Sequence, residues 1–143
     1  MAPTQSGSSP APAAAQAEVF SAPRQDKPWG HELIFAAVDG LYAGKIIQVR
    51  AGHALSLQYH RDKDETISVL AGEALFEYGP DVDELTERRF GPGDTIHLPA
   101  GARHRVTAIT DLTFAEASTA APGWREDVVR LDDKYGRTGT SAP

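Results

Sequence analysis

A glutamine, two histidines and a glutamate form the combination of polar side chains in this chain that is best suited to chemistry. Gln58 and His60 lie two residues apart in "LSLQYH", Glu65 follows closely, and His104 lies in the distant segment "PAGARHR". The chain has no cysteine, so any metal site must use nitrogen and oxygen ligands. The four residues predict a site for a divalent ion (Zn, Mn, Co, Ni or Fe) with positions open for substrate or water.

The elements that would position these residues read as β-strands. Short β-rich runs are separated by Gly, Pro and Asp at intervals of about 8 to 12 residues, which is typical of an all-β sandwich or barrel. Along one such run, Ser56, Gln58 and His60 share a face because strand side chains alternate. A polar face of this kind favours a barrel whose interior carries polar groups.

Length and charge limit the possible partners. The chain has 143 residues, which favours one domain, and its formal charge of −6 argues against a nucleic-acid or anionic-membrane surface. Residues 1–18 are rich in Ala, Pro and Ser, and residues 138–143 have a similar composition, so both segments are predicted to be disordered tails flanking a domain at 19–137. No apolar run reaches the roughly 18 residues of a membrane span, so a cytoplasmic location is expected.

The spacing of the candidate ligands resembles the two motifs of the cupin superfamily. The first motif is matched, with glutamine replacing its first histidine, by Gly52, Gln58, His60, Glu65 and Gly72. The second is matched, with Ala108 where an asparagine is usual, by Gly93, Pro99, Gly101 and His104. The resemblance implies a single-domain, all-β cupin, which is a double-stranded β-helix or jelly-roll barrel.

Further segments resemble the cupin domain of type II phosphomannose isomerases. They are "KPWG", "LSLQYH", "LPAGARHR" and "EDVVRLDDKYGR". The resemblance implies that Gln58, His60, Glu65 and His104 are metal ligands and that the protein is an aldose–ketose isomerase. Its substrate would be a sugar or a sugar phosphate, as in mannose-6-phosphate isomerases. A homodimer is also expected from the resemblance, whereas guanylyl transfer is not.

The sequence offers several candidates for the catalytic base and for the substrate contacts. With Glu65 used as a ligand, the candidate bases are Glu116, His97 and Lys63. The candidate substrate-binding residues are Arg130, Arg137 and Lys63. Arginine suits phosphate because its planar fork donates two parallel hydrogen bonds. Alternatively, Asp127 or Asp132 pairs with these arginines and fixes the terminal segment.

Departures from the isomerase pattern keep two other functions open. In "DKDETI", Lys63 replaces the family's arginine and Thr66 its histidine, while "EASTA" keeps Glu116 but lacks the family's glutamine and glycine. These changes are compatible with a non-catalytic sugar-binding or regulatory cupin. The two histidines and Glu65 also match the 2-His-1-carboxylate pattern of an iron-dependent dioxygenase.

Overall fold

The computed structural model describes residue 11 and residues 14–140, and this part of the chain contains no α-helix. The eleven strands are β1 (Arg24–Lys27), β2 (Gly30–Val38), β3 (Tyr42–Val49), β4 (Leu57–Tyr59), β5 (Glu65–Ala71), β6 (Ala74–Gly79), β7 (Thr86–Phe90), β8 (Thr95–Leu98), β9 (Arg103–Ala108), β10 (Leu112–Thr119) and β11 (Val129–Asp132). The all-β prediction is confirmed.

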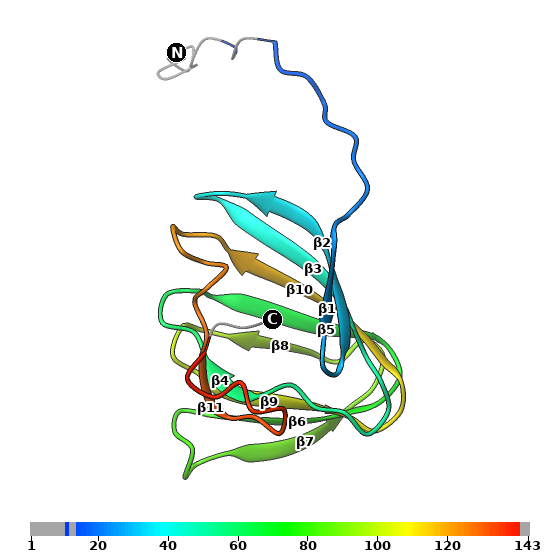
Figure 1. Cartoon of the computed structure of the whole chain (residues 1–143), viewed down its shortest axis with the longest axis vertical. Coiled ribbons are helices and arrows are strands. Elements are labelled where there is room, and N and C mark those ends of the chain that lie inside the picture. The colour runs from blue at the N-terminus through cyan, green and yellow to red at the C-terminus, as the bar shows by residue number, and fades with distance from the viewer. Residues whose placement is uncertain (1–10, 12–13, 141–143) are drawn as a thin grey trace, which may run out of the picture.

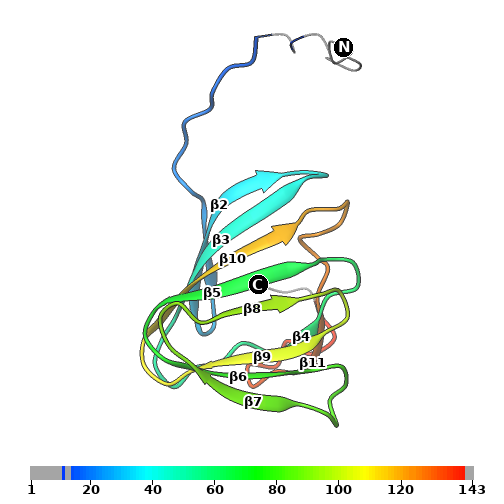
Figure 2. The ribbon, with the colours of Figure 1, turned by 180° about the vertical axis from the view of Figure 1, so that it is seen from behind.

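The strands form two antiparallel sheets that face each other (Figure 1). One sheet has six strands in the order β1-β2-β3-β10-β5-β8, and the other has five in the order β11-β4-β9-β6-β7. Figure 2 shows the first sheet from behind, with β10 between β3 and β5. Sequence-distant strands therefore lie side by side, as expected for a jelly-roll barrel.

Most of the predicted N-terminal tail and residues 141–143 of the predicted C-terminal tail lie outside the described residues. Thr140 belongs to the predicted C-terminal tail, and its carbonyl accepts a hydrogen bond from Arg130 at 3.0 Å. Within the described part of the chain, no helix has the length and apolar character needed to cross a membrane.

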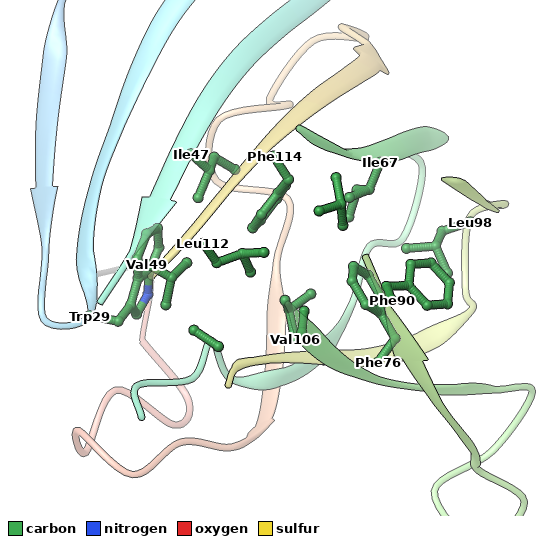
Figure 3. Packing of buried hydrophobic residues seen from close by; sticks show 13 residues of the cluster. Trp29, Ile47, Val49, Ile67, Phe76, Phe90, Leu98, Val106, Leu112 and Phe114 are labelled. Atoms are coloured by element: carbon green, nitrogen blue, oxygen red, sulfur yellow. The ribbon is translucent and has the colours of Figure 1, made fainter. Parts of the chain in front are cut away.

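The apolar core lies between the two sheets (Figure 3). Its thirteen buried residues are Trp29, Ile47, Val49, Ile67, Val69, Ala74, Phe76, Phe90, Leu98, Val106, Ala108, Leu112 and Phe114. The rings of Phe76 and Phe90 stack with centroids 4.3 Å apart. Burying one such side chain stabilises a fold by about 1.5–3 kcal/mol, so this cluster is the main source of the barrel's stability.

The inward faces of the strands change from apolar to charged along their length. On β10, Leu112 and Phe114 are buried in the core and Glu116 continues the same alternation. On β3, Ile47 lies in the core, and Lys45, two residues earlier, lines a cavity of about 350 Å³. Because every second side chain of a strand points inward, these strands give the interior of the barrel an apolar half and a polar half.

A close backbone approach fixes the turn between β5 and β6. Gly72 has φ of +86°, and a Cβ atom there would lie 2.0 Å from the carbonyl oxygen of Asp111. Only glycine satisfies both conditions, because other residues rarely adopt this conformation and would also clash. This explains the glycine that ends the first motif.

Candidate metal centre

Three buried side chains converge at the polar end of the interior. His60 directly follows β4, Glu65 begins β5, and His104 is the second residue of β9. Their exposed fractions are only 5%, 1% and 2%. The loop at 61–64 connects His60 to Glu65, while the β4–β9 pairing places His104 opposite Gln58. The fold therefore joins both motifs at one point.

The ligand atoms of these three residues are within reach of a single ion. The Nε2 atoms of His60 and His104 each lie 3.1 Å from Oε1 of Glu65. All three ligand atoms lie within 4.8 Å of one another. This set provides two imidazole nitrogens and one carboxylate oxygen, which suits a divalent transition metal or zinc.

Hydrogen bonds on the far side of each ring orient the two histidines. Nδ1 of His60 donates to the carbonyl of Asp127 at 2.6 Å, and Nδ1 of His104 donates to the carbonyl of Ala102 at 3.0 Å. A neutral imidazole protonated on Nδ1 presents a lone pair at Nε2. Two such lone pairs then face the carboxylate of Glu65, an arrangement that a cation would stabilise.

Unpartnered atoms support the same conclusion. In the described part of the chain, His104 Nε2 and Glu65 Oε2 are buried without a hydrogen-bond partner. Leaving buried polar atoms unpaired costs about 1–3 kcal/mol each, unless a ligand satisfies them. The residues present therefore fit a divalent metal ion.

Gln58 lies beside this group and lines the cavity. Its Oε1 accepts a hydrogen bond from Ser56 Oγ at 2.7 Å, so the predicted polar face of this segment is formed. The carboxamide oxygen is the atom that could act as a fourth ligand. Ser56 is itself buried and would orient it.

The histidines determine the charge state of Glu65. Burial alone would raise the pKa of this carboxyl, but the close contacts with the imidazoles of His104 and His60 outweigh burial and hold the pKa well below its usual range. For His104, burial lowers the pKa, and contacts with Glu65 more than offset this, so its pKa is raised. The Glu65 side chain is therefore anionic at neutral pH, as a ligand for a cation would have to be.

A second buried carboxyl, that of Glu116, lines the same cavity. Burial, followed by the negative charge of Glu65, raises the pKa of Glu116 to about 7, although Lys63 and Lys45 act in the opposite direction. This candidate base is 8% exposed and lies at the end of the apolar stripe of β10. A carboxyl with a pKa near 7 can both accept and donate a proton at neutral pH.

Asp127 holds the loop at 61–64, which connects the candidate ligands His60 and Glu65. Its carboxylate accepts hydrogen bonds from the backbone N–H groups of Arg61, Asp62 and Lys63 at 2.7, 2.9 and 2.9 Å. Its carbonyl also orients His60. The alternative in which Asp127 pairs with an arginine of the terminal segment is therefore wrong, because its carboxylate is occupied by the loop.

The two arginines of the terminal segment both line the cavity, and they differ in their partners. Arg137 forms a two-point ion pair with Asp133, at 2.9 and 3.0 Å, whereas Arg130 donates to a backbone carbonyl. Asp132 pairs with Arg105 at 3.1 Å instead. The sequence suggested that Asp132 pairs with one of these arginines, and this was wrong. Arg137 pairs with the next residue, Asp133, because the chain turns back there.

The remaining candidate bases occupy different environments. The Lys63 side chain is 7% exposed and lines the cavity, with Nζ 3.8 Å from Oε2 of Glu65. His97 lies on the outer face of β8, 60% exposed, and pairs with Asp64 at 2.8 Å. The structure therefore removes His97 from the cavity, because strand alternation directs Leu98 inward and His97 outward.

Sequence reasoning missed the ion pair between Lys45 and Glu32. Lys45 Nζ lies 3.1 Å from Glu32 Oε1, and Lys45 is the cross-strand partner of Glu116. The sequence did contain an indication that Lys45 points inward, because Lys45 continues the alternation of Ile47 and Val49. A charged residue in phase with an apolar stripe indicates either a paired core charge or a functional site.

Comparisons of the sequence with known proteins agree with this geometry. The Cupin domain family matches residues 45–115. The xanthan biosynthesis protein XanB of Xanthomonas campestris is 30% identical over 130 residues, covering 85% of this chain and 27% of that protein. Mannose-1-phosphate guanylyltransferase of Escherichia coli is 33% identical over 113 residues, covering 78% and 22%. The chain therefore spans about a quarter of the length of these relatives.

Solved structures show the same fold at lower identity. The capsular polysaccharide assembling protein CapF from Staphylococcus aureus superposes with a TM-score of 0.67 and 15% identity, covering 80% of this chain and 35% of that chain. Oxalate decarboxylase from Bacillus subtilis gives 0.68 and 16%, covering 81% and 33%. With two facing sheets, both motifs and this family match, the chain belongs to the cupin superfamily, and its sequence is similar to part of the mannose-1-phosphate guanylyltransferases.

Proposed function

We propose that this cupin is a metal-dependent aldose–ketose isomerase acting on a sugar or sugar phosphate. The observation that carries the proposal is Glu116, a buried carboxyl with a pKa of about 7 that lines the same cavity as Gln58 and His60. Isomerisation needs one group to move a proton between adjacent carbons beside a group that stabilises negative charge. Glu116 and the ligand group would divide these tasks.

The chemistry assigned to Glu116 is a proton transfer from C2 to C1. The carboxylate accepts the proton from C2 of the aldose, the C2–H electrons form the C1–C2 double bond, and the π electrons of the carbonyl move to its oxygen, which takes up a proton from water. Glu116 then returns its proton to C1, where the electrons of the C1–C2 double bond form the new C–H bond, while the O–H electrons at C2 form the ketose carbonyl and the hydroxyl proton passes to water. Positive charge at the ligand group would lower the pKa of Glu116 and favour the basic form that starts the reaction.

Gln58, His60, Glu65 and His104 would hold the ion. When bound, a divalent metal supplies a Lewis acid that stabilises the negative charge developing on the sugar oxygens. Lys63 and Lys45 act on Glu116 through their charge, so they would hold it in the anionic form between turnovers. The cavity of about 350 Å³ lies at the small end of the range for ligand sites and suits one monosaccharide.

The relatives support the substrate class. Mannose-1-phosphate guanylyltransferase is named for a phosphorylated hexose, and XanB for the biosynthesis of a polysaccharide. This chain matches only about a quarter of each, so their activities enter here as a proposal for a hexose or hexose phosphate substrate.

The decisive test is exchange of the C2 proton with solvent. We expect metal-loaded protein in D2O to exchange this proton in mannose 6-phosphate or in a related aldose, as measured by proton NMR. Glu116→Gln should reduce exchange at least about 100-fold, because it removes the base, and should retain the metal. Glu126→Gln is the matched control, since Glu126 lines the cavity but is exposed.

Two results would contradict the proposal. One is a metal-loaded sample that exchanges no hexose or hexose phosphate over hours. The other is a Glu116→Gln variant with unchanged exchange, which would show that another group moves the proton.

A second function is favoured by the ligand geometry alone. His60, Glu65 and His104 supply two imidazoles and one carboxylate, the set used by non-haem iron oxygenases. Iron-loaded protein that consumes dioxygen with a small organic substrate, and that exchanges no sugar proton, would replace the isomerase proposal with an oxygenase.

A further inference from the structure

Charged side chains form a row across the inner face of the six-stranded sheet. They lie on four neighbouring strands, β2, β3, β10 and β5, which Figure 2 shows side by side. The row consists, in that order, of Glu32, Lys45, Glu116 and Glu65. Glu65 belongs to the candidate metal centre and Glu116 is the proposed base, so the other two members lie beyond the base. We call Glu32 and Lys45 the Glu–Lys pair.

Strand pairing fixes the spacing of this row. Lys45 is the cross-strand partner of Glu116, and neighbouring strands lie about 4.8 Å apart. On the other side of Lys45, β2 pairs with β3 so that Glu32 lies opposite Ile47 and diagonal to Lys45. The Glu–Lys pair and Glu116 all line the cavity of about 350 Å³. One monosaccharide in this cavity can therefore contact the proposed base and the pair together.

The Glu–Lys pair is buried, and its hydrogen-bonding capacity is largely unused. Nζ of Lys45 lies 3.1 Å from Oε1 of Glu32, and the two side chains are 16% and 6% exposed. Within residues 14–140, this is the only hydrogen bond that either side chain makes. An ammonium has three N–H donors, and a carboxylate can accept about four hydrogen bonds. Most of these donors and acceptor positions are therefore available to a ligand in the cavity.

A contribution to stability is a poor explanation for such a pair. Removing two charges from water costs free energy that one ion-pair contact often fails to recover, so apolar side chains of similar volume can be equally stable. Apolar residues do occur beside the pair, since Ile34 and Ile47 line the same cavity. Burial lowers the pKa of Lys45, but the charges of Glu116 and Glu32 more than offset this effect and raise the pKa. The barrel therefore maintains charges where apolar side chains would fit.

A ligand that matches the pair needs a donor and an acceptor close together. A hydroxyl group provides both, and two adjacent hydroxyls can contact a cation and an anion at once. The carbons of a sugar beyond C2 carry hydroxyls of this kind. We infer that the Glu–Lys pair binds the C3 and C4 hydroxyls of the sugar. Lys45 donates to their oxygens, and Glu32 accepts from their O–H groups.

The order of the row also orients the sugar. This inference rests on the proposed function, in which C1 and C2 lie beside Glu116 and the candidate metal centre. With the reacting end held there, C3 and C4 extend toward β3 and β2, where the Glu–Lys pair lies. Hydrogen bonds to charged groups are stronger than neutral ones, and a missing hydroxyl leaves their donors and acceptors unpaired. The pair therefore selects sugars by their hydroxyl pattern.

The experiment measures sugar binding by fluorescence, whether or not the sugar is converted. Trp29 and Trp124, the two tryptophans of the chain, both line the cavity, and Lys45 Nζ lies 6.0 Å from the ring centre of Trp124. Mannose and mannose 6-phosphate are titrated into metal-loaded protein, each beside its 3-deoxy and 4-deoxy analogues. We expect the loss of either hydroxyl to raise Kd about tenfold or more in the wild type.

Three variants separate recognition from stability. In Glu32→Leu/Lys45→Met, both analogues should bind within about twofold of the parent sugar, with metal content retained and Tm not lowered by more than a few degrees. Glu32→Gln keeps the side-chain volume and should reduce the discrimination at least about threefold. The matched control is Glu77→Leu/Arg105→Met, which removes a partly buried ion pair on β6 and β9, outside the cavity lining. It should retain the discrimination of the wild type.

Equal discrimination in the wild type and in both Glu32 variants would overturn the inference, as would the binding of neither sugar to the wild type. A strongly lowered Tm in the double variant, with unchanged discrimination in Glu32→Gln, would assign the pair to stability alone. Proton exchange separates this inference from the proposed function. Exchange without discrimination at C3 or C4 would keep the isomerase and exclude the hydroxyl subsite. Pair-dependent discrimination without exchange of any sugar would keep the subsite and exclude the isomerase.

Discussion

Replacing Asp133 by asparagine tests how strongly the terminal segment is held to the barrel. The carboxylate accepts from the backbone N–H of Arg137 at 2.7 Å and makes two bonds to its guanidinium. The side chains are 0% and 8% exposed. Removing one partner of a buried ion pair costs about 3–5 kcal/mol, and because Arg137 also reaches the cavity we expect the lower value, about 3 kcal/mol. For a domain of this size, that lowers Tm by about 10 °C.

The pH dependence of this loss has a definite sign. Hydrogen bonds from Arg137 hold the pKa of Asp133 below its usual range. A carboxyl with a depressed pKa in the folded state stabilises the protein above its unfolded value of about 3.9, and this contribution is lost as the pH falls through the folded value. The stability difference between wild type and Asp133→Asn should therefore be complete at pH 7 and shrink below about pH 4.

Urea unfolding of wild type and variant, at equal metal loading and at several pH values, measures this difference. Asp132→Asn is the matched control, since its side chain is 72% exposed and should cost less than about 0.5 kcal/mol. A loss below about 1 kcal/mol for Asp133→Asn at pH 7 would refute the reasoning, because it would mean that solvent screens the pair.

Substitutions in and around the candidate metal centre should separate its ligands from its surroundings. His60→Ala and His104→Ala should each abolish stoichiometric metal binding, as measured by elemental analysis, and full occupancy in both would mean that the ion binds elsewhere. Asp127→Ala should weaken metal affinity about tenfold or more in a competition titration, because the loop at 61–64 loses its anchor; unchanged affinity would show that the loop holds itself. His97→Ala should leave metal content and proton exchange unchanged, since its side chain faces outward; a large loss of exchange would restore it as a base candidate.

The fold and the ligand group were largely predictable from local sequence. Strand alternation over "LSLQYH" depends only on the geometry of an extended chain, so Gln58 and His60 had to share a face. Glu65 follows within a single turn, and the structure brings it together with His60 and His104. The cupin fold was implied by the resemblance of the two spaced motifs to that superfamily, and spacing over a few residues limits the local geometry strongly.

The roles of side chains whose partners are distant in the sequence could not be predicted from local spacing. The sequence suggested Asp127 or Asp132 as the partner of Arg130 and Arg137, and only the turn after β11 decided that Asp133 pairs with Arg137. Asp127 binds a loop more than sixty residues away, and His97 faces outward because β8 pairs with β5 in one register.

The physical reason is that local alternation determines which residues share a face, whereas the pairing between distant strands determines which face is buried and what it meets. The alternation of β3 and β10 by itself placed Lys45 and Glu116 in phase with apolar residues. Only the closure of the two sheets made those positions the wall of a cavity and brought Lys27 and Arg130 to its edge. Burial and the identity of charged neighbours set the pKa of Glu116, and both are properties of the assembled barrel.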